Sequence, residues 1–190
     1  MGVQRPGDRR RHRGRDARAV RPRRAAAAPR GGRARAAGDD GYPPYANPVV
    51  AAADIRGRPA PPLEVQTWLT DQPDLAGKVL VVDFWATWCG PCIASIPHTN
   101  DLATRFRDDV VVVGLSNEDF GTVRSFLRRS GIEYSIGVDP MARTQTAVGV
   151  IGIPHMMVVS PDGIVRFQGQ PSDLTAEILG RIVKASRRSD

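Results

Sequence analysis

The hydrophobic positions in the middle of the chain follow a strand, helix, strand order. Two short runs, Val79 to Ala86 and Val110 to Leu115, are almost continuously apolar and rich in β-branched or aromatic residues, which is typical of buried strands. Between them, apolar residues recur at helical intervals, at Ile93, Ile96, Leu102 and Phe106. This order predicts two parallel strands of one sheet, joined by a crossover helix.

The pattern continues with a second crossover helix, a third strand and a short helix. Ser116, with Asp119 three residues later, resembles a capping box, an apolar stripe follows, and Gly131 fits the end of that helix. Tyr134 to Val138 predicts a weaker strand. The segment Asp139 to Ala147 opens with an Asp-Pro pair, which favours the start of a helix.

The C-terminal part predicts a hairpin and a closing helix. Met156 to Val159 and Ile164 to Gln168 predict strands, and the intervening Ser160 to Gly163 holds turn-forming Pro, Asp and Gly residues. We therefore expect these two strands to be antiparallel. An apolar stripe predicts a helix over Asp173 to Ala185. Together the elements predict an α/β domain with a mixed sheet.

The first 47 residues differ in composition from the rest of the chain. They contain 13 Arg, no Lys and 4 Asp, a net charge of +9, whereas residues 48–190 carry 14 basic and 16 acidic residues. Only five of their apolar residues are larger than Ala or Pro, too few to offset the entropy cost of ordering. We therefore predict a disordered Arg/Ala/Pro-rich segment over 1–47 and a single domain over 48–190.

The Arg-rich segment leaves several interpretations open. It can be an arm that binds nucleic acid or an anionic membrane, or it can reflect a GC-rich coding sequence or a mis-assigned start codon. No aromatic residues interleave with its arginines, as stacking on bases would require. The chain has no apolar run of the roughly 18 to 20 residues that span a bilayer, so as written it predicts a soluble protein.

The two cysteines, Cys89 and Cys92, directly follow the first predicted strand and lie at the start of the next helix. The unpaired N–H groups and the dipole at a helix N-terminus favour an anion, so the first thiol should ionise more readily than an ordinary cysteine. Ionisation also makes Cys89 a better leaving group, which tunes the balance between its reduced and oxidised states.

A structural disulfide and a zinc site are the alternatives to a redox dithiol. In a loop-entropy treatment, a disulfide that closes a four-residue ring contributes only about 1.9 kcal/mol, against about 4.7 kcal/mol for a hundred-residue loop. Zinc needs four ligands, and beyond the two sulfurs the chain offers only His12, His98 and His155. Redox chemistry is therefore the favoured interpretation.

The residues around the dithiol resemble the active-site signature of the thioredoxin superfamily, in the run Phe84-Trp85-Ala86-Thr87-Trp88-Cys89-Gly90-Pro91-Cys92. Two further stretches, Gly77-Lys78-Val79 and the Pro-rich Gly57 to Leu63, are most similar to its TlpA-like thiol-disulfide oxidoreductases. The resemblance covers about Asp54 to Lys184. It implies a thioredoxin fold, with a central mixed sheet flanked by helices, and a dithiol that exchanges with disulfides or thiols of partner proteins.

The resemblance also implies roles for single residues. Trp88, Gly90 and Pro91 match positions beside the nucleophile, and Pro97 matches a proline that kinks the helix. The family carries a cis-proline opposite the dithiol, and Ile153-Pro154 fits that place. Such a proline leaves the backbone of Ile153 free to pair with an extended substrate segment.

Asp83 interrupts the apolar run before the dithiol. Burying an ionised carboxylate without a partner is costly, so Asp83 either lies at an exposed edge or has a raised pKa. A raised carboxyl could take the proton from Cys92, and thioredoxins that resemble this sequence carry an Asp in that role. A satisfied strand-end Asp without a chemical role is the alternative.

Ser95 stands where many TlpA-like proteins have a Glu, so we expect Asp83 to carry the acid-base role instead. His155, directly after Pro154, either shifts the ionisation of the sulfurs or serves in packing. Trp68 is expected in the core or in a lid.

These observations predict a thiol-disulfide oxidoreductase that reduces protein disulfides. The Cys89 thiolate attacks a substrate disulfide, and Cys92, deprotonated with help from Asp83, resolves the mixed disulfide. The Gly90-Pro91 pair is the one that reducing members of the family carry. We expect no cofactor beyond the redox-active Cys89–Cys92 disulfide. We also expect a monomer that meets protein disulfide or dithiol substrates and a separate redox-recycling partner.

A function from another class stays open, as does the compartment. The rival is a thioredoxin-like binding module whose Arg-rich arm binds nucleic acid or an anionic membrane. TlpA-like proteins are usually exported or tethered to a membrane, and the N-terminal sequence shows neither feature, so the sequence leaves the compartment undetermined.

Overall fold

The computed structural model describes residues 41–188, and the predictions of disorder and polyanion binding for residues 1–40 lie outside that range. The strands are β1 (Thr67–Trp68), β2 (Val79–Phe84), β3 (Val110–Ser116), β4 (Ser135–Val138), β5 (His155–Val159) and β6 (Val165–Gly169). The helices are α1 (Gly90–Arg105), α2 (Phe120–Leu127), α3 (Arg143–Val148) and α4 (Ala176–Ser186), with a 3-10 turn, η1, at Pro171–Asp173. No helix in the described range is long and apolar enough to cross a bilayer.

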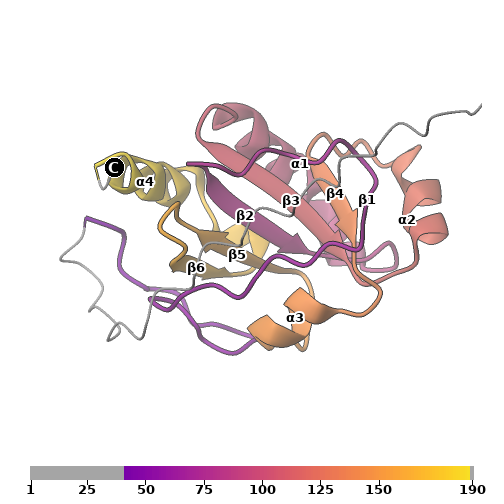
Figure 1. Cartoon of the computed structure of the whole chain (residues 1–190), viewed down its shortest axis with the longest axis horizontal. Coiled ribbons are helices and arrows are strands. Elements are labelled where there is room, and N and C mark those ends of the chain that lie inside the picture. The colour runs from indigo at the N-terminus through magenta and orange to yellow at the C-terminus, as the bar shows by residue number, and fades with distance from the viewer. Residues whose placement is uncertain (1–40, 189–190) are drawn as a thin grey trace, which may run out of the picture. The chain divides into compact units, whose positions relative to one another are not determined.

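The strands form one mixed sheet in the order β1-β4-β3-β2-β5-β6 (Figure 1). β2 pairs with β3, and β3 with β4, in parallel, which confirms the predicted crossovers through α1 and α2. β5 lies antiparallel to both β2 and β6, as the predicted hairpin requires. Gly163 in the hairpin turn has a φ of +81°, a conformation that favours glycine. The architecture is the thioredoxin fold that the sequence resembles.

Neighbouring residues of β2 pack into two hydrophobic clusters. Val81 belongs to a cluster that includes Leu102 of α1 and Leu179 of α4, whereas Val82 belongs to a cluster that includes Val148 of α3. Because successive side chains of a strand point to opposite faces, both faces of β2 are covered. A strand buried on both sides has no need of alternating polar residues, which explains the nearly continuous apolar run.

Two helices begin later than the sequence predicted. α2 is capped by Asp119, whose Oδ1 accepts the N–H of Thr122 at 3.0 Å, while Ser116 is the last residue of β3 and not the cap. α3 begins at Arg143 and not near Asp139. The Asp139 Oδ2 nevertheless accepts the N–H of Arg143 at 2.7 Å, so it supports the helix start from outside.

The sequence did not predict one short strand, and it placed the start of the last helix too early. The edge strand Thr67–Trp68 pairs antiparallel with β4, although its two residues carry no periodicity of their own. Trp68 is partly buried in this strand. The last helix begins at Ala176 and follows the η1 turn, whereas the sequence placed its start at Asp173.

Residues 41–47 correct the predicted domain boundary. Tyr42 was assigned to the disordered segment, but its side chain is only 5% exposed and lies in the main hydrophobic cluster. Its ring stacks 3.6 Å from the guanidinium carbon of Arg166, and its hydroxyl lies 3.3 Å from the Ser186 Oγ. The Asn47 Nδ2 donates to the Gln168 carbonyl at 2.8 Å. The folded domain therefore begins before residue 48.

Candidate active site

Cys89 and Cys92 form a disulfide at the N-terminus of α1, with a Cα–Cα distance of 5.2 Å. Cys89 is the N-cap of this 16-residue helix, and its Sγ accepts the backbone N–H of Cys92 at 3.2 Å. The first turn of the helix contains no acidic residue. One sulfur therefore lies where unpaired N–H groups and the helix dipole stabilise negative charge, as the sequence predicted.

The two cysteines are buried beneath an exposed rim. Cys89 and Cys92 are 4% and 2% exposed, whereas Trp88 is 72% exposed, and Gly90 and Pro91 also face solvent. The expected neighbours of the nucleophile thus surround it at the surface. A partner that reaches the disulfide must contact this rim.

A groove of about 410 Å³ runs beside α1 and contains the predicted proline. Pro91 and Ser95 of α1 line it, together with Pro154 and Pro171. The Ile153–Pro154 peptide bond is cis, which confirms the prediction from the resemblance. The active-site turn and the cis-proline are therefore brought together from segments far apart in the sequence.

Asp83 lies within β2 and not at an exposed edge. Its side chain is 2% exposed, its Oδ2 accepts the Tyr134 hydroxyl at 3.4 Å, and its Oδ1 has no hydrogen-bond partner within residues 41–188. Burial raises the pKa of Asp83 to about 7, against a smaller lowering effect of the Tyr134 hydroxyl. Burial, together with the Asp83 carboxylate, also raises the pKa of Tyr134. Asp83 is thus a carboxyl group that can exchange a proton near neutral pH.

Glycine on the neighbouring strand makes room for this buried pair. Gly114 of β3 pairs with Asp83, and a Cβ built on it would lie 2.6 Å from Ile136 Cδ1 and 3.0 Å from both Trp85 Nε1 and Tyr134 Cε2. A larger residue would displace the Tyr134 ring, so the close approach requires glycine here.

The geometry around His155 favours its packing role. The residue is 1% exposed and pairs with Phe84 on the neighbouring strand β2. Gln168 uses its Oε1 to accept the Ile55 N–H, so its Nε2 is the donor that lies 3.3 Å from the His155 Nε2. Burial lowers the pKa of His155 to about 4, against a raising effect of the Val50 backbone. A neutral His155 places no charge near the sulfurs at neutral pH.

Two polar side chains of α1 are occupied by backbone groups. The Ser95 hydroxyl donates to the Cys92 carbonyl at 2.7 Å, and the His98 Nε2 lies 3.0 Å from the Leu174 carbonyl. The Ser95 hydroxyl is thus engaged with the backbone of its own helix.

Glu118 is a site residue that the sequence analysis missed. Its Oε2 accepts the backbone N–H of Thr87 at 2.6 Å, and its Oε1 accepts the Thr87 hydroxyl at 2.7 Å. Ser116 donates a third hydrogen bond to the Oε2 at 3.1 Å. Thr87 follows β2 and Glu118 follows β3, so the parallel pairing brings both residues to the same edge of the sheet. The predicted parallel pairing of these two strands was the sequence signal that could have identified Glu118.

No three His, Cys, Asp or Glu side chains come together in residues 41–188 in a way that could hold a metal ion. The Cys89 and Cys92 sulfurs are a pair that can exchange with another disulfide or dithiol.

Known relatives agree with this interpretation of the site. The thiol:disulfide interchange protein HelX of Rhodobacter capsulatus is 32% identical over 124 residues, which cover 62% of this chain and 69% of HelX. The thiol-disulfide oxidoreductase ResA of Bacillus anthracis is 26% identical over 95 residues, which cover 48% of this chain and 54% of ResA. The chain thus spans about half the length of the ResA relatives that it matches.

A solved structure supports the same assignment. A Chlorobium tepidum protein described as the thiol:disulfide interchange protein DsbE is 29% identical, with a TM-score of 0.52, over 58% of this chain and 82% of that one. Residues 58–180, which include the dithiol, Asp83, Glu118 and the cis-proline, match the family described as Redoxin. The chain belongs to the redoxin family, and within the thioredoxin superfamily it is TlpA-like.

Proposed function

We propose that the protein is a thiol-disulfide oxidoreductase that reduces disulfides of partner proteins through Cys89 and Cys92. The observation that carries the proposal is the position of the disulfide. The Cys89 sulfur lies at the N-cap of α1, where it accepts a hydrogen bond from the Cys92 N–H. The names of the relatives, which describe disulfide interchange and thiol-disulfide oxidoreduction, support the same class of reaction.

The reaction begins from the reduced dithiol. The Cys89 thiolate attacks one sulfur of a substrate disulfide, a Cys89–substrate bond forms, and the other substrate sulfur leaves as a thiolate. The Cys92 thiol then loses its proton, its sulfur attacks the Cys89 Sγ, and the first substrate sulfur leaves. The substrate gains two electrons and takes up two protons, while Cys89 and Cys92 become the disulfide. A separate dithiol partner must supply two electrons to restore the enzyme.

We propose the attacking role for Cys89 and the resolving role for Cys92, and their surroundings support this choice. Cys89 is the N-cap, its Sγ accepts the Cys92 N–H, and its neighbours Trp88 and Gly90 are exposed, which supports the attacking role. Cys92 lies one turn into the helix and is 2% exposed. The Gly90-Pro91 pair, which reducing members of the family carry, favours reduction over oxidation.

Asp83 is proposed to accept the Cys92 proton during resolution. A carboxyl group with a pKa of about 7 is present partly as the base and partly as the acid near neutral pH, so it can take up and return a proton. Tyr134 donates to Asp83 and thereby stabilises its ionised form. The free Oδ1 of Asp83 leaves one oxygen available to receive the proton.

Substrate recognition is proposed to use backbone contacts. The cis-proline lies at the groove that also contains Pro91, and the backbone of Ile153 precedes it. Strand addition at Ile153 suits an extended segment of varied sequence. The enzyme is proposed to act as a monomer.

Substitution of each cysteine separates the two roles. We expect Cys89→Ser to lose the enzyme-catalysed part of insulin reduction by dithiothreitol, leaving only the direct reaction with dithiothreitol, because the nucleophile is lost. We expect Cys92→Ser to accumulate a stable mixed disulfide between Cys89 and the substrate, because the resolving thiol is missing. Intact mass spectrometry should detect it as an added mass that a reductant removes. Insulin reduction by the Cys89→Ser protein at the native rate would refute the mechanism, as would a Cys92→Ser protein that accumulates no mixed disulfide.

Replacing Asp83 by Asn should change the pH dependence of stability. The pKa of Asp83 rises from 3.8 to about 7 on folding, so ionising it costs the folded state about 4 kcal/mol. The free energy of unfolding of the native protein therefore falls as the pH rises from about 4 to about 7. Asp83→Asn has no carboxyl group to ionise, so this contribution to the decrease is absent. Urea unfolding of the oxidised proteins should show Asp83→Asn to be more stable at pH 8 and equal at pH 3.

The same Asp83→Asn variant should release substrate from the mixed disulfide about 10²-fold more slowly at pH 7, because it has no carboxylate to take the Cys92 proton. Stopped-flow measurement of substrate thiol release checks this step. If the native and Asp83→Asn proteins change stability in parallel from pH 3 to pH 9, Asp83 does not titrate with a raised pKa in the folded state. If Asp83→Asn also releases substrate at the native rate, Asp83 does not accept the Cys92 proton.

Removing the Glu118 side chain should disturb the approach to Cys89. In Glu118→Ala, the Thr87 N–H and hydroxyl lose their acceptors, so we expect the second-order rate of Cys89 attack on a small disulfide to fall about tenfold. Thr87→Ser, which keeps both donors, is the matched control and should react at the native rate. If Glu118→Ala attacks as fast as the native protein well below its melting temperature, Glu118 does not position the active-site turn.

A further inference from the structure

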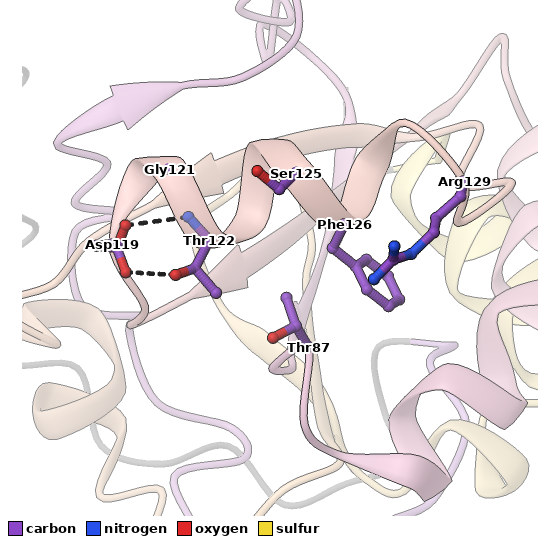
Figure 2. A pocket seen from close by; sticks show the side chains of 7 residues that line it. All are labelled: Thr87, Asp119, Gly121, Thr122, Ser125, Phe126 and Arg129. Atoms are coloured by element: carbon purple, nitrogen blue, oxygen red, sulfur yellow. Dashed lines mark hydrogen bonds between the residues drawn. The ribbon is translucent and has the colours of Figure 1, made fainter.

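An open groove of about 700 Å³ lies between the active-site turn and helix α2 (Figure 2). Thr87 faces the helix from the active-site turn, and Thr122, Ser125, Phe126 and Arg129 come from α2 and the residues that follow it. We refer to this hollow as the α2 groove. It shares no lining residue with the groove beside Pro154.

The two ends of the α2 groove carry opposite charges. Asp119 lies at one end, and its carboxylate accepts the N–H of Thr122 at 3.0 Å and the Thr122 hydroxyl at 2.6 Å (Figure 2). Arg129 lies at the other end, beside Phe126. Phe126 packs on the buried Trp85 with 5.6 Å between ring centroids, so it forms a fixed part of the groove.

The positive end has no ion-pair partner among residues 41–188. Arg129 forms no ion pair with any acidic side chain of residues 41–188, and neither do Arg124 and Arg128 nearby. Four arginines of the domain, Arg56, Arg143, Arg166 and Arg187, do have an acidic partner, as Arg143 has in Asp139 at 2.9 Å and Arg187 in Asp109 at 2.6 Å. The guanidinium of Arg129 is therefore available to a carboxylate from outside.

The position of the groove links it to the reacting sulfur. Thr87 is two residues before Cys89, and the Thr87–Glu118 hydrogen bonds fix this part of the turn to the end of β3. A chain segment whose cysteine reaches Cys89 can extend along α2 at roughly 3.3 Å per residue.

We propose that the α2 groove binds an acidic segment of the disulfide-bearing partner protein, with an Asp or Glu side chain of that segment at Arg129. The inference rests on the proposed disulfide reduction and adds a preference among its substrates. Asp119 at the opposite end repels a second carboxylate, so the groove also orients the segment. Because an exposed arginine–carboxylate pair contributes little, the preference is about threefold in rate and weakens with salt.

The test compares two synthetic disulfide peptides that differ only in glutamate or lysine at positions two to six residues from the cysteine. The full-length native enzyme should reduce the glutamate peptide about threefold faster in kcat/KM at low salt, and equally fast at 0.5 M salt. Arg129→Gln should bring the ratio of the two peptides to about one. Arg124→Gln is the matched control, because Arg124 lies 5.5 Å over the Phe120 ring and does not line the groove.

A small uncharged disulfide, hydroxyethyl disulfide, separates this inference from the function on which it rests. Native, Arg124→Gln and Arg129→Gln enzymes should reduce it at equal rates. Equal rates for both peptides in the native enzyme, or a preference that survives Arg129→Gln, would overturn the acidic-segment proposal while the reductase function stands. An enzyme inactive on hydroxyethyl disulfide and on both peptides would overturn the proposed function, and the groove's role with it.

Discussion

The hydrogen bond from the Cys92 N–H to the Cys89 sulfur, at the first turn of α1, is the interaction on which the site depends. It exists because Cys89 occupies the N-cap, where a side chain accepts from a residue two or three positions later. In most helices a Ser, Thr, Asp or Asn oxygen has this position. Here a sulfur occupies it, so the free N–H groups that a helix must satisfy become the groups that stabilise a thiolate.

The rest of the fold holds this helix start in a fixed relation to two other features. Parallel pairing of β2 with β3 places Glu118 against Thr87, and these hydrogen bonds secure the turn that leads into Cys89. Antiparallel pairing of β2 with β5 places the segment with the cis-proline near α1. The dithiol is therefore attached by short connections to a strand that is buried on both faces, and both cysteines pack within the main hydrophobic cluster.

Much of this arrangement could be predicted from the sequence because its signals are local. The apolar run ending at Ala86, followed by Cys89 and Cys92 and a helical repeat, places a dithiol at a helix start without any knowledge of the fold. Asp83 is conspicuous within that run for the same reason, and its burial agrees with the raised-pKa alternative. The cis bond before Pro154 came only from the family resemblance, since sequence periodicity carries no signal for it.

The features that escaped prediction depend on residues distant in the chain. Tyr42 contacts Arg166 and Ser186, which lie more than a hundred residues away in the chain. The sequence next to Tyr42 has few large apolar residues, so it did not predict that Tyr42 belongs to the folded domain. The short β1 strand exists through its pairing with β4, and the role of Glu118 exists through the edge that β2 and β3 share. Tertiary contacts supply the free energy in each case, and a single sequence does not display them.

The central claim is that Cys89 and Cys92 form an exchangeable couple and not a structural staple. Equilibration of the full-length protein with glutathione buffers of defined potential, and with dithiothreitol buffers for the most reducing points, followed by thiol alkylation and intact mass measurement, tests it directly. We expect a reversible two-electron transition between about −120 and −270 mV, the range of thioredoxin-like exchange proteins. A disulfide that stays oxidised below about −300 mV, as structural disulfides do, would contradict the account.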